Sequence, residues 1–287
     1  MQMKQVLIII LLFLLASCKK NDSSSTGTGT NTGTKIKRII TSAPGSREAS
    51  VEYFEYDANN RLSKYTFTNE DSSLIPIVLD KDQTFYFYSA NENKPTGDSI
   101  VINGTIFKNS FTYDAQDRLI KTEQFNSNGT IFRRNLYSYA TNKVIWMNYF
   151  QTAPGSGVLF YASLDTLFLD AQSRLTEQRS YFPPGTLLDF KETFTYNASP
   201  NPCDLLNTNK YLATYFNGSD YLFLGNRYRN NMVTSRHKPN LGTAYGSDIT
   251  SYSYNASGYP VSATGLAIND LANPSVTSPF TVRYEYY

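Results

Sequence analysis

Histidine and cysteine are almost absent from this chain, which limits the chemistry it can perform. Among 287 residues there is one histidine, His237, and there are two cysteines, Cys18 and Cys203. Imidazole-based metal sites use several such ligands, so we expect no metal. The sequence also has no glycine-rich phosphate loop, no Gly-x-Ser-x-Gly motif and no acid-rich calcium loop, so we expect no cofactor. His237 lies in a polar stretch that we expect to be a surface loop.

An excess of charge of one sign is also absent. The formal net charge is +2, and lysine and arginine are interspersed with acidic residues, so we expect no nucleic-acid partner. Two pairs of acids lie close in the sequence, Asp114 with Asp117 and Asp165 with Asp170. Paired carboxylates can hydrolyse glycosides, but these fall where turns are expected, and turn capping accounts for them. The sequence therefore predicts a protein that is not an enzyme.

The first twenty residues contain a short apolar run from Val6 to Ala16, preceded by Lys4. The run is too short to span a bilayer comfortably, and it ends in Leu-Ala-Ser-Cys at residues 15–18. This pattern resembles a bacterial lipoprotein signal, and the alternative is an ordinary signal peptide with an incidental cysteine. The resemblance implies that Cys18 carries a diacylglycerol and an acyl chain such as palmitate. It implies an outer-membrane lipoprotein of the cell envelope and leaves the periplasmic or surface-exposed side open.

Composition divides the chain into three parts. Residues 1–17 are the expected signal peptide, and residues 18–34 are the lipidated cysteine with a flexible linker of serine, threonine, glycine and asparagine. Residues 35–287 are expected to form a single repeat domain, although their number also fits two smaller ones. With Cys18 lipidated, Cys203 has no partner for a disulfide within the chain, and we expect it to be a small buried residue.

A short phrase, Tyr-Asp-Ala-x-x-Arg-Leu, recurs along the sequence. It occurs at residues 56–62 and 113–119 and returns with leucine for tyrosine at 169–175, while shorter copies stand at 196–198 and 254–256. Such self-similarity is typical of a repeat protein. The predicted turn residues are Tyr56, Asp57, Arg61, Leu62, Tyr113, Asp114, Arg118, Leu119, Asp170, Arg174, Leu175, Tyr196, Asn197, Tyr254 and Asn255.

Each copy of the phrase predicts a β-hairpin. Before the turn, aromatic residues alternate with small hydroxyl residues, as in Phe111-Thr112-Tyr113, which predicts a strand with one aromatic and one polar face. The aspartate can accept hydrogen bonds from nearby backbone N–H groups and so start a turn. Turns containing Pro-Gly or Asn-Gly lie between the copies, so we expect aspartate turns on one rim and glycine turns on the other.

The number of hairpins sets the architecture. Weaker copies near residues 88, 139, 224 and 286 bring the total to nine hairpins. Nine hairpins would make about sixteen to eighteen strands, and open sheets rarely exceed about ten strands without curling. We therefore expect an all-β fold, a large antiparallel meander rolled into a flattened barrel or a strongly curved sheet. A short helix is compatible with residues 203–216. A membrane-spanning barrel is the second alternative, but Arg283 and Glu285 would then face the hydrocarbon, which is costly.

The repeated phrase resembles divergent YD repeats of the kind found in RHS shell proteins. Together with the signal that ends at Cys18-Lys19-Lys20, it also resembles uncharacterised Bacteroidota lipoproteins of a family described as porin-like in fold. The resemblance covers most of residues 35–287. It implies a large antiparallel β-sheet protein on the cell envelope, and it implies no catalytic residues.

These observations favour a membrane-anchored, non-enzymatic module that binds an envelope glycan or a protein partner. The alternative is a carrier of lipid or another hydrophobic ligand inside the rolled sheet, since that many strands enclose more space than side chains fill. Aromatic rings near the Pro-Gly turns could stack on sugars, and they are Trp146, Tyr149, Phe150, Tyr161 and Tyr181. Among them, Trp146, Tyr149 and Tyr161 are the candidates for ligand binding.

Overall fold

The computed structural model describes residues 35–71, 77–151, 153, 156–171, 174–182, 187–200, 230–239, 245–269 and 276–287. The expected signal peptide and linker with Cys18, the possible helix near 203–216 and Cys203 lie outside these residues. The described residues form strands and turns, with no helix among them. Accordingly, no helix in this part of the chain is long and apolar enough to cross a membrane.

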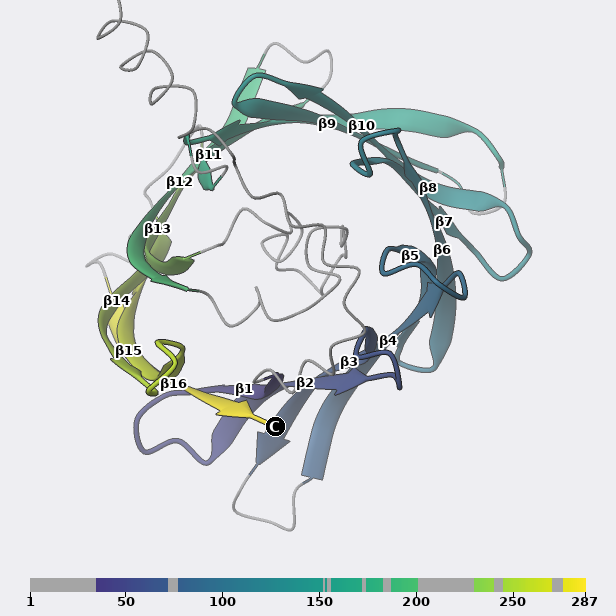
Figure 1. Ribbon diagram of the computed structural model, residues 1–287. Helices are drawn as coiled ribbons and strands as arrows, with labels where there is room; N and C mark the ends of the chain where they lie inside the picture. Colours follow the sequence, from purple (N-terminus) through teal and green to yellow (C-terminus); the bar gives the residue numbers. More distant parts are fainter. Residues whose placement is uncertain are drawn as a thin grey trace, which may run out of the picture. The chain divides into compact units, whose positions relative to one another are not determined.

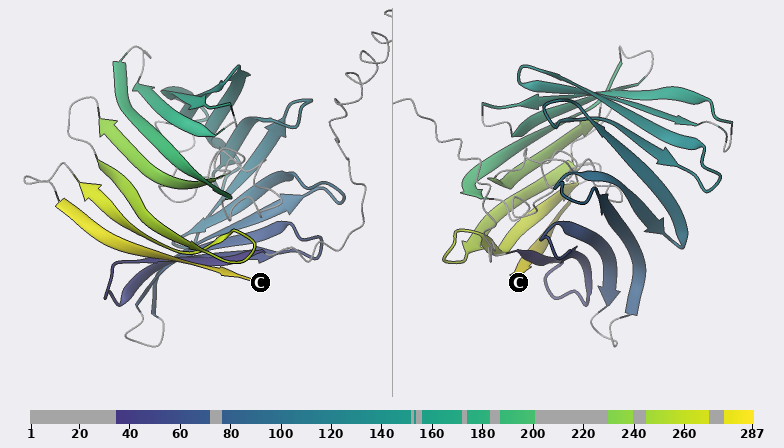
Figure 2. Two further views of the ribbon diagram at one scale, coloured as in Figure 1. Left: turned by 60° about the vertical axis from the view of Figure 1, so that its left-hand side comes forward. Right: turned by 45° about the vertical axis from the view of Figure 1, so that its right-hand side comes forward.

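The strands form one antiparallel meander, in which each strand pairs with the next along the chain (Figures 1 and 2). The strands are β1 (Ile36–Ser42), β2 (Glu48–Tyr56), β3 (Leu62–Asp71), β4 (Ile77–Tyr88), β5 (Pro95–Ile102), β6 (Thr105–Tyr113), β7 (Leu119–Phe125), β8 (Ile131–Ala140), β9 (Lys143–Gln151), β10 (Leu159–Leu169), β11 (Leu175–Phe182), β12 (Leu187–Pro200), β13 (Asn230–Pro239), β14 (Tyr245–Tyr254), β15 (Pro260–Asn269) and β16 (Val276–Tyr286). The predicted all-β meander of repeated hairpins is confirmed.

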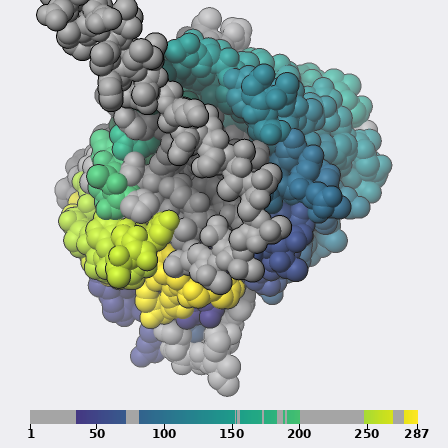
Figure 3. All heavy atoms as spheres, in the orientation of Figure 1, coloured from purple at the N-terminus to yellow at the C-terminus, as the bar shows by residue number. Residues whose placement is uncertain are grey.

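The first and last strands join the two ends of the meander. β1 pairs with β16 from Ile36 opposite Tyr286 to Ser42 opposite Thr281, so the order of strands closes into a barrel. Beyond these pairs, the N–H of Tyr287 donates to the carbonyl of Lys35 at 2.9 Å. Figure 3 shows the yellow C-terminal residues beside purple residues of the N-terminal strands. Closure leaves neither β1 nor β16 as an exposed sheet edge, which is the site where chains aggregate most readily.

The connecting turns alternate between two rims because the meander reverses at every turn. One rim, the aspartate rim, contains the turns at 57–61, 114–118, 170–174 and 255–259. The opposite rim, the glycine rim, contains the described turns at 43–47, 103–104 and 126–130, each with a glycine at positive φ. The two classes of turn therefore occupy opposite ends of the strands.

At the aspartate rim, one carboxylate closes each of the turns at 57–61, 114–118 and 170–174. The Oδ1 atom of Asp57 accepts the N–H groups of Asn59 and Arg61, each at 2.9 Å, and Oδ2 accepts Nε–H of Arg61 at 2.7 Å. Asn60 occupies the left-handed region at φ 63°, which asparagine tolerates better than most residues. Asp114 and Asp170 bind Arg118 and Arg174 in the same way, at 2.7 and 2.6 Å. The side chain thus replaces backbone partners that a tight turn lacks.

The shorter copies of the phrase differ from one another. Asn255 closes its turn by accepting the N–H groups of Ser257 and Tyr259, both at 3.0 Å, as the aspartates do. Asn197, in contrast, lies inside β12, which continues to Pro200, so the predicted turn at 196–198 is wrong. Its Oδ1 still accepts the N–H of Ser199 at 3.0 Å, but the pairing of β12 with β13 continues past it to Pro200 opposite Asn230, so the chain here is extended.

Tyrosines at strand ends connect neighbouring strands at the same rim. In six places a tyrosine hydroxyl donates to the carbonyl of the first residue of the preceding strand. The pairs are Tyr56 to Ile36 at 2.9 Å, Tyr88 to Leu62 at 2.6 Å, Tyr113 to Pro95 at 2.8 Å, Tyr139 to Leu119 at 2.7 Å, Tyr196 to Leu175 at 2.6 Å and Tyr286 to Pro260 at 2.6 Å. Each bond satisfies a carbonyl at the point where its strand begins.

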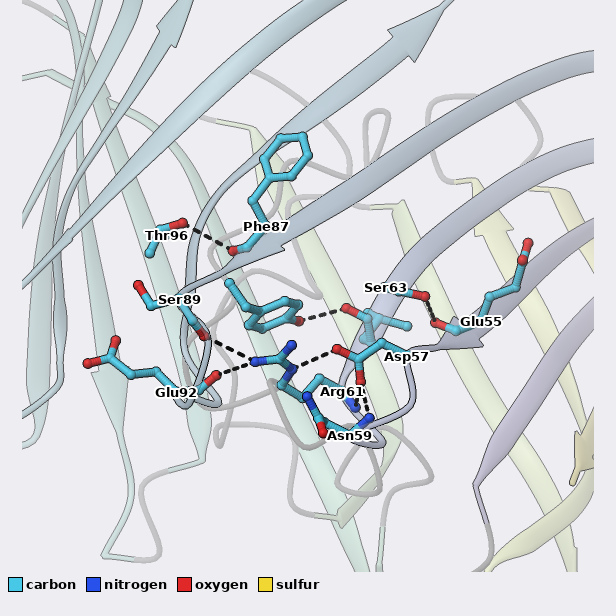
Figure 4. A network of polar contacts seen from close by, with 11 residues as sticks. Glu55, Asp57, Asn59, Arg61, Ser63, Phe87, Ser89, Glu92 and Thr96 are labelled. Carbon is cyan, nitrogen blue, oxygen red and sulfur yellow. Dashed lines mark hydrogen bonds and ion pairs between the residues drawn. The ribbon is translucent and has the colours of Figure 1, made fainter.

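A cation lies over the ring of most of these tyrosines. The guanidinium of Arg61 lies 4.4 Å from the ring centre of Tyr88 and also donates to the carbonyls of Ser89 and Glu92, at 3.2 and 2.9 Å (Figure 4). The other pairs are Lys35 over Tyr56 at 4.9 Å, Lys94 over Tyr113 at 5.7 Å, Arg118 over Tyr139 at 4.6 Å and Arg174 over Tyr196 at 5.4 Å. A cation that follows one turn therefore holds the tyrosine that precedes the next.

Period-two alternation gives the sheet two different faces. One face, the aromatic face, holds two clusters of buried side chains, one around Phe54 and Tyr65 and one around Tyr137, Trp146 and Leu167. Side chains converge on the concave side of a closed sheet and diverge on its convex side, so the more buried aromatic face is the one turned to the interior. The other, the charged face, holds cross-strand and same-strand ion pairs. They are Arg38–Glu285, Lys64–Glu55, Lys121–Glu123, Arg134–Glu123, Arg179–Glu177 and Lys191–Glu177.

Replacing Asp57 with alanine should destabilise the fold by about 1 to 2 kcal/mol, because two backbone N–H groups and the Arg61 guanidinium lose their acceptor. The matched control is Glu55→Ala, which removes an exposed ion pair with Lys64 on the neighbouring strand and should cost less than about 0.5 kcal/mol. Urea unfolding of the three proteins measures both values. Equal effects at the two positions would contradict the role given to the aspartate.

Candidate functional site

Three exposed phenylalanines lie at adjacent strand ends on the glycine rim. Phe150 of β9, Phe160 of β10 and Phe182 of β11 expose 43%, 48% and 52% of their surface. Phe150 and Phe160 are directly opposite each other in the β9–β10 pairing. By alternation from Trp146 in β9 and from Ser180 in β11, the rings project on the aromatic face. We call these three residues the phenylalanine row.

Polar side chains lie next to the phenylalanine row on the aromatic face, at the next position of each strand that projects on this face. They are Asn148 of β9, Ser163 of β10 and Ser180 of β11, and Arg133 of β8 lies opposite Phe150. The Nε–H of Arg133 donates to Oδ1 of Asn148 at 3.0 Å, which fixes both side chains. Exposed rings beside oriented amide, hydroxyl and guanidinium groups can hold a ligand that has both apolar and hydroxylated surfaces.

Deeper on the aromatic face, polar groups are joined by hydrogen bonds. Asn135 donates to Thr122 at 2.9 Å and accepts the indole N–H of Trp146 at 3.0 Å. Asp165 accepts from Gln178 and from Ser163, both at 3.2 Å. Because these polar groups are hydrogen-bonded to one another, they hold the neighbouring side chains of the candidate site in place.

Trp146 was expected among the exposed rings, and the structure corrects this. It is only 4% exposed, and its ring stacks on Tyr137 with centroids 6.3 Å apart. The strand places it in the middle of β9, where neighbouring strands cover it on both sides, whereas Phe150 stands at the end of the same strand.

Tyr149 and Tyr161 lie opposite each other on β9 and β10, with ring centroids 5.6 Å apart. By alternation they project on the charged face, opposite to the phenylalanine row. Burial raises the pKa of Tyr161, and the neighbouring Tyr149 and Asp165 raise it further. These two rings pack on each other at the edge of the candidate site rather than within it.

Two carboxyl groups on the aromatic face, Glu52 of β2 and Asp98 of β5, have pKa values well above the usual range. Burial raises the pKa of Glu52 to about 7, although the hydrogen bond from Tyr65 lowers it. Burial likewise raises the pKa of Asp98, which is 1% exposed, to about 7, against the lowering effect of Asn109. The amide of Asn109 donates to Oδ1 of Asp98 at 2.5 Å, while Oδ2 is buried without a hydrogen-bond partner. The cost of desolvating both carboxylates explains these shifts.

The acid pairs considered in the sequence have separate partners in the structure. Asp114 is bound by Arg118, while Asp117 binds Lys94 at 2.5 Å. Asp165 lies buried in β10 with Gln178, whereas Asp170 is bound by Arg174 in the following turn. Each carboxylate therefore has a structural role.

His237, which was expected in a surface loop, belongs to strand β13, where its backbone lies opposite Glu192 and Tyr245. The polar stretch around it is part of the sheet because the meander continues through it. Within the described ranges, no group of three or more histidine, cysteine, aspartate or glutamate side chains could hold a metal ion.

Comparison with solved structures finds this fold in other proteins. A porin-like protein from Bacteroides vulgatus ATCC 8482 is 14% identical, with a TM-score of 0.51, and the match covers 89% of this chain and 99% of that one. A porin-like protein from Bacteroides uniformis ATCC 8492 is 11% identical, with a TM-score of 0.45, over 88% and 96% of the two chains. The first likeness shows that the two proteins share a fold.

A complex named TcdB2-TccC3-Cdc42 also matches, at 8% identity and a TM-score of 0.21, over 81% of this chain and 16% of that one. No family model matches the sequence. No curated protein matches it either.

Sequence reasoning missed Phe160 and Phe182. Both residues flank a Pro-Gly sequence, as Phe150 does, and this is the signal that could have found them. A ring next to a turn lies at a strand end, where only part of its surface is covered by neighbouring strands. Alternation alone gives the face of such a residue and not its exposure.

The buried Asp98 should make stability depend on pH. Its pKa in the fold, about 7, exceeds the value near 4 of an unfolded chain, so the folded state holds the extra proton between these values. The free energy of unfolding should therefore fall as pH rises from about 4 to 7 and then level off. Asp98→Asn should remove about half of this fall, because Glu52 has a similarly raised pKa, and be more stable than the unchanged protein at pH 8, by on the order of 3 kcal/mol.

Urea unfolding at several pH values measures this difference, with Glu55→Gln as an exposed control. A variant at Asp98 that keeps the pH dependence of the unchanged protein would show that the carboxyl does not titrate as described.

Proposed function

We propose that this protein is a non-enzymatic lipoprotein of the cell envelope that binds glycans at the phenylalanine row. The observation that carries the proposal is the set of three exposed rings on neighbouring strands, beside Arg133, Asn148 and Ser163. Sugar rings present C–H surfaces that pack on aromatic rings and hydroxyl groups that pair with amides and guanidinium groups. Exposed apolar rings in a row are unusual on a protein surface and mark sites of interaction.

The membrane attachment in this proposal depends on Cys18. Cleavage after residue 17 would leave a lipidated cysteine, and residues 18–34 would link it to the barrel. Two or more acyl chains suffice for stable anchoring. The charged face supports this arrangement, because its ion pairs in mid-strand suit water and would be costly in hydrocarbon. The barrel would then stand in an aqueous compartment at the outer membrane. We also assign the repeated phrase to the YD repeats that it resembles.

Carriage of a hydrophobic ligand inside the barrel is less well supported. The aromatic face carries buried polar side chains, among them Asp98, Asp165 and Glu192. An alkyl chain packed against such groups would deprive them of hydrogen bonds, at a cost of roughly 1 to 3 kcal/mol each. A glycan, in contrast, has hydroxyl groups on every sugar ring, and these can form hydrogen bonds with such polar side chains.

A glycan array probed with the purified full-length protein tests the proposal, followed by calorimetry with any glycan retained. The double variant Phe150→Ala/Phe160→Ala should weaken binding at least about 10-fold, since each stacked ring contributes on the order of 1 kcal/mol. Phe87→Ala is the matched control, because Phe87 is 50% exposed on the charged face of β4.

The control variant should bind as the unchanged protein does. Retention of no glycan, or equal affinity of the double variant and the unchanged protein, would overturn the proposal. Hydrolysis of a glycan that is abolished by an acid-to-amide change would show instead that the protein is an enzyme.

A further inference from the structure

A half-open cleft of about 740 Å³ lies on the other side of the barrel from the phenylalanine row, across strands β1, β2, β15 and β16. Ile40 and Val51, which are opposite each other on β1 and β2, form part of its lining. Both belong to the charged face, whereas the phenylalanine row belongs to the aromatic face. The volume falls within the range of small-molecule sites in proteins.

The walls of the cleft are rich in hydroxyl groups. They are Ser42, Ser46, Ser262, Thr264 and Thr281. Val51 in the same lining is buried, so the cleft combines apolar surface with hydroxyl groups that can both donate and accept hydrogen bonds. This combination suits a chain of sugar rings, which alternates apolar faces with hydroxyl edges.

Arginines give the cleft a preference for a charge. Arg38 is engaged by Glu285 through two hydrogen bonds, at 2.6 and 3.0 Å. Arg283 contacts the same carboxylate at 3.1 Å and leaves 61% of its side chain exposed. Arg47 lies exposed in the turn at the end of the cleft. Arg47 and Arg283 are therefore exposed at the cleft, and a guanidinium has five N–H donors in a geometry that matches a carboxylate, so each can bind a ligand in addition to its contacts within the protein.

Carboxylates in the cleft balance these charges. Glu70 accepts the hydroxyls of Tyr53 and Thr68, at 2.7 and 2.8 Å, and Asp71 lies beside it in the sequence and in the lining. Glu285 pairs with Arg38 and Arg283 from outside the lining, and with Glu70 and Asp71 it matches the three arginines in number, so the cleft should not attract polyanions in general. Its acids can accept ligand hydroxyls while its accessible arginines bind one acidic group.

We propose that this cleft binds an acidic saccharide, with a sugar carboxylate on Arg47 and Arg283 and sugar hydroxyls on Glu70 and the hydroxyl-lined walls. The site is separate from the phenylalanine row and does not depend on the function proposed for it.

Calorimetry with the purified full-length protein tests this inference, using an oligogalacturonide and a neutral galactose oligomer of the same length. The unchanged protein should bind the acidic oligomer at least 10-fold more tightly than the neutral one. The double variant Arg47→Gln/Arg283→Gln should lose this difference. Arg179→Gln is the matched control, because Arg179 pairs with Glu177 on the same face of β11, outside the cleft.

The variants should keep the urea midpoint of the unchanged protein. Arg47→Gln alone, in an exposed turn, replaces the double variant if that one fails to fold. Absence of oligogalacturonide binding, equal binding of the two oligomers, or full binding by the cleft variants would each overturn the proposal. Loss of binding in Phe150→Ala/Phe160→Ala while the cleft variants bind fully would place the ligand on the phenylalanine row instead.

Discussion

The contact of a cation with the tyrosine of the next unit is the interaction on which the barrel depends. Arg61 is held by the aspartate of its own turn and covers Tyr88, whose hydroxyl donates to Leu62. One residue thereby connects three strands. The same arrangement recurs at Arg118 and Arg174, and lysine takes the place of arginine at Lys35 and Lys94. Because each unit is attached to the next, a series of small contacts fixes the register of a large sheet. Where leucine replaces tyrosine, at Leu169, a backbone bond to Asn142 at 2.8 Å remains.

The two rims consequently have different roles. The aspartate rim is occupied by capped turns and covered tyrosines, whose side chains are already engaged. The described turns of the glycine rim at 43–47, 103–104 and 126–130 each have a glycine at positive φ, and the side-chain bonds within them stay local, such as those of Thr130 with Asn126 and Asn128. Both proposed sites lie toward this second rim. The phenylalanine row stands at strand ends beside Pro-Gly sequences, and Arg47 lies in the turn between β1 and β2. The contacts at the aspartate rim therefore stabilise the barrel, and the glycine rim can carry binding surfaces, as loops on a rigid scaffold commonly do.

Much of the fold could be predicted from the sequence, because its signals are local. The turn at Asp57 depends on five consecutive residues, and period-two alternation specifies the faces of each strand. The contact of Arg61 with Tyr88 could not be predicted, since it depends on which units become neighbours. The exposed fraction of each aromatic ring could not be predicted either, because it depends on position within the strand. Trp146 is covered by strands on both sides, while Phe160 at a strand end is not. The turn expected at Asn197 is absent because β12 continues to pair with β13 as far as Pro200, and His237 was assigned to a loop because its neighbours are polar.

A double-mutant cycle between Arg118 and Tyr139 tests the central claim most directly. Arg118→Met removes the charge and Tyr139→Leu removes the ring, and urea unfolding of the four proteins gives their coupling free energy. The contact at 4.6 Å predicts a coupling of about 0.5 to 1 kcal/mol in favour of the pair. A coupling near zero, with the two single losses simply adding, would contradict the claim that the cation of one unit holds the tyrosine of the next.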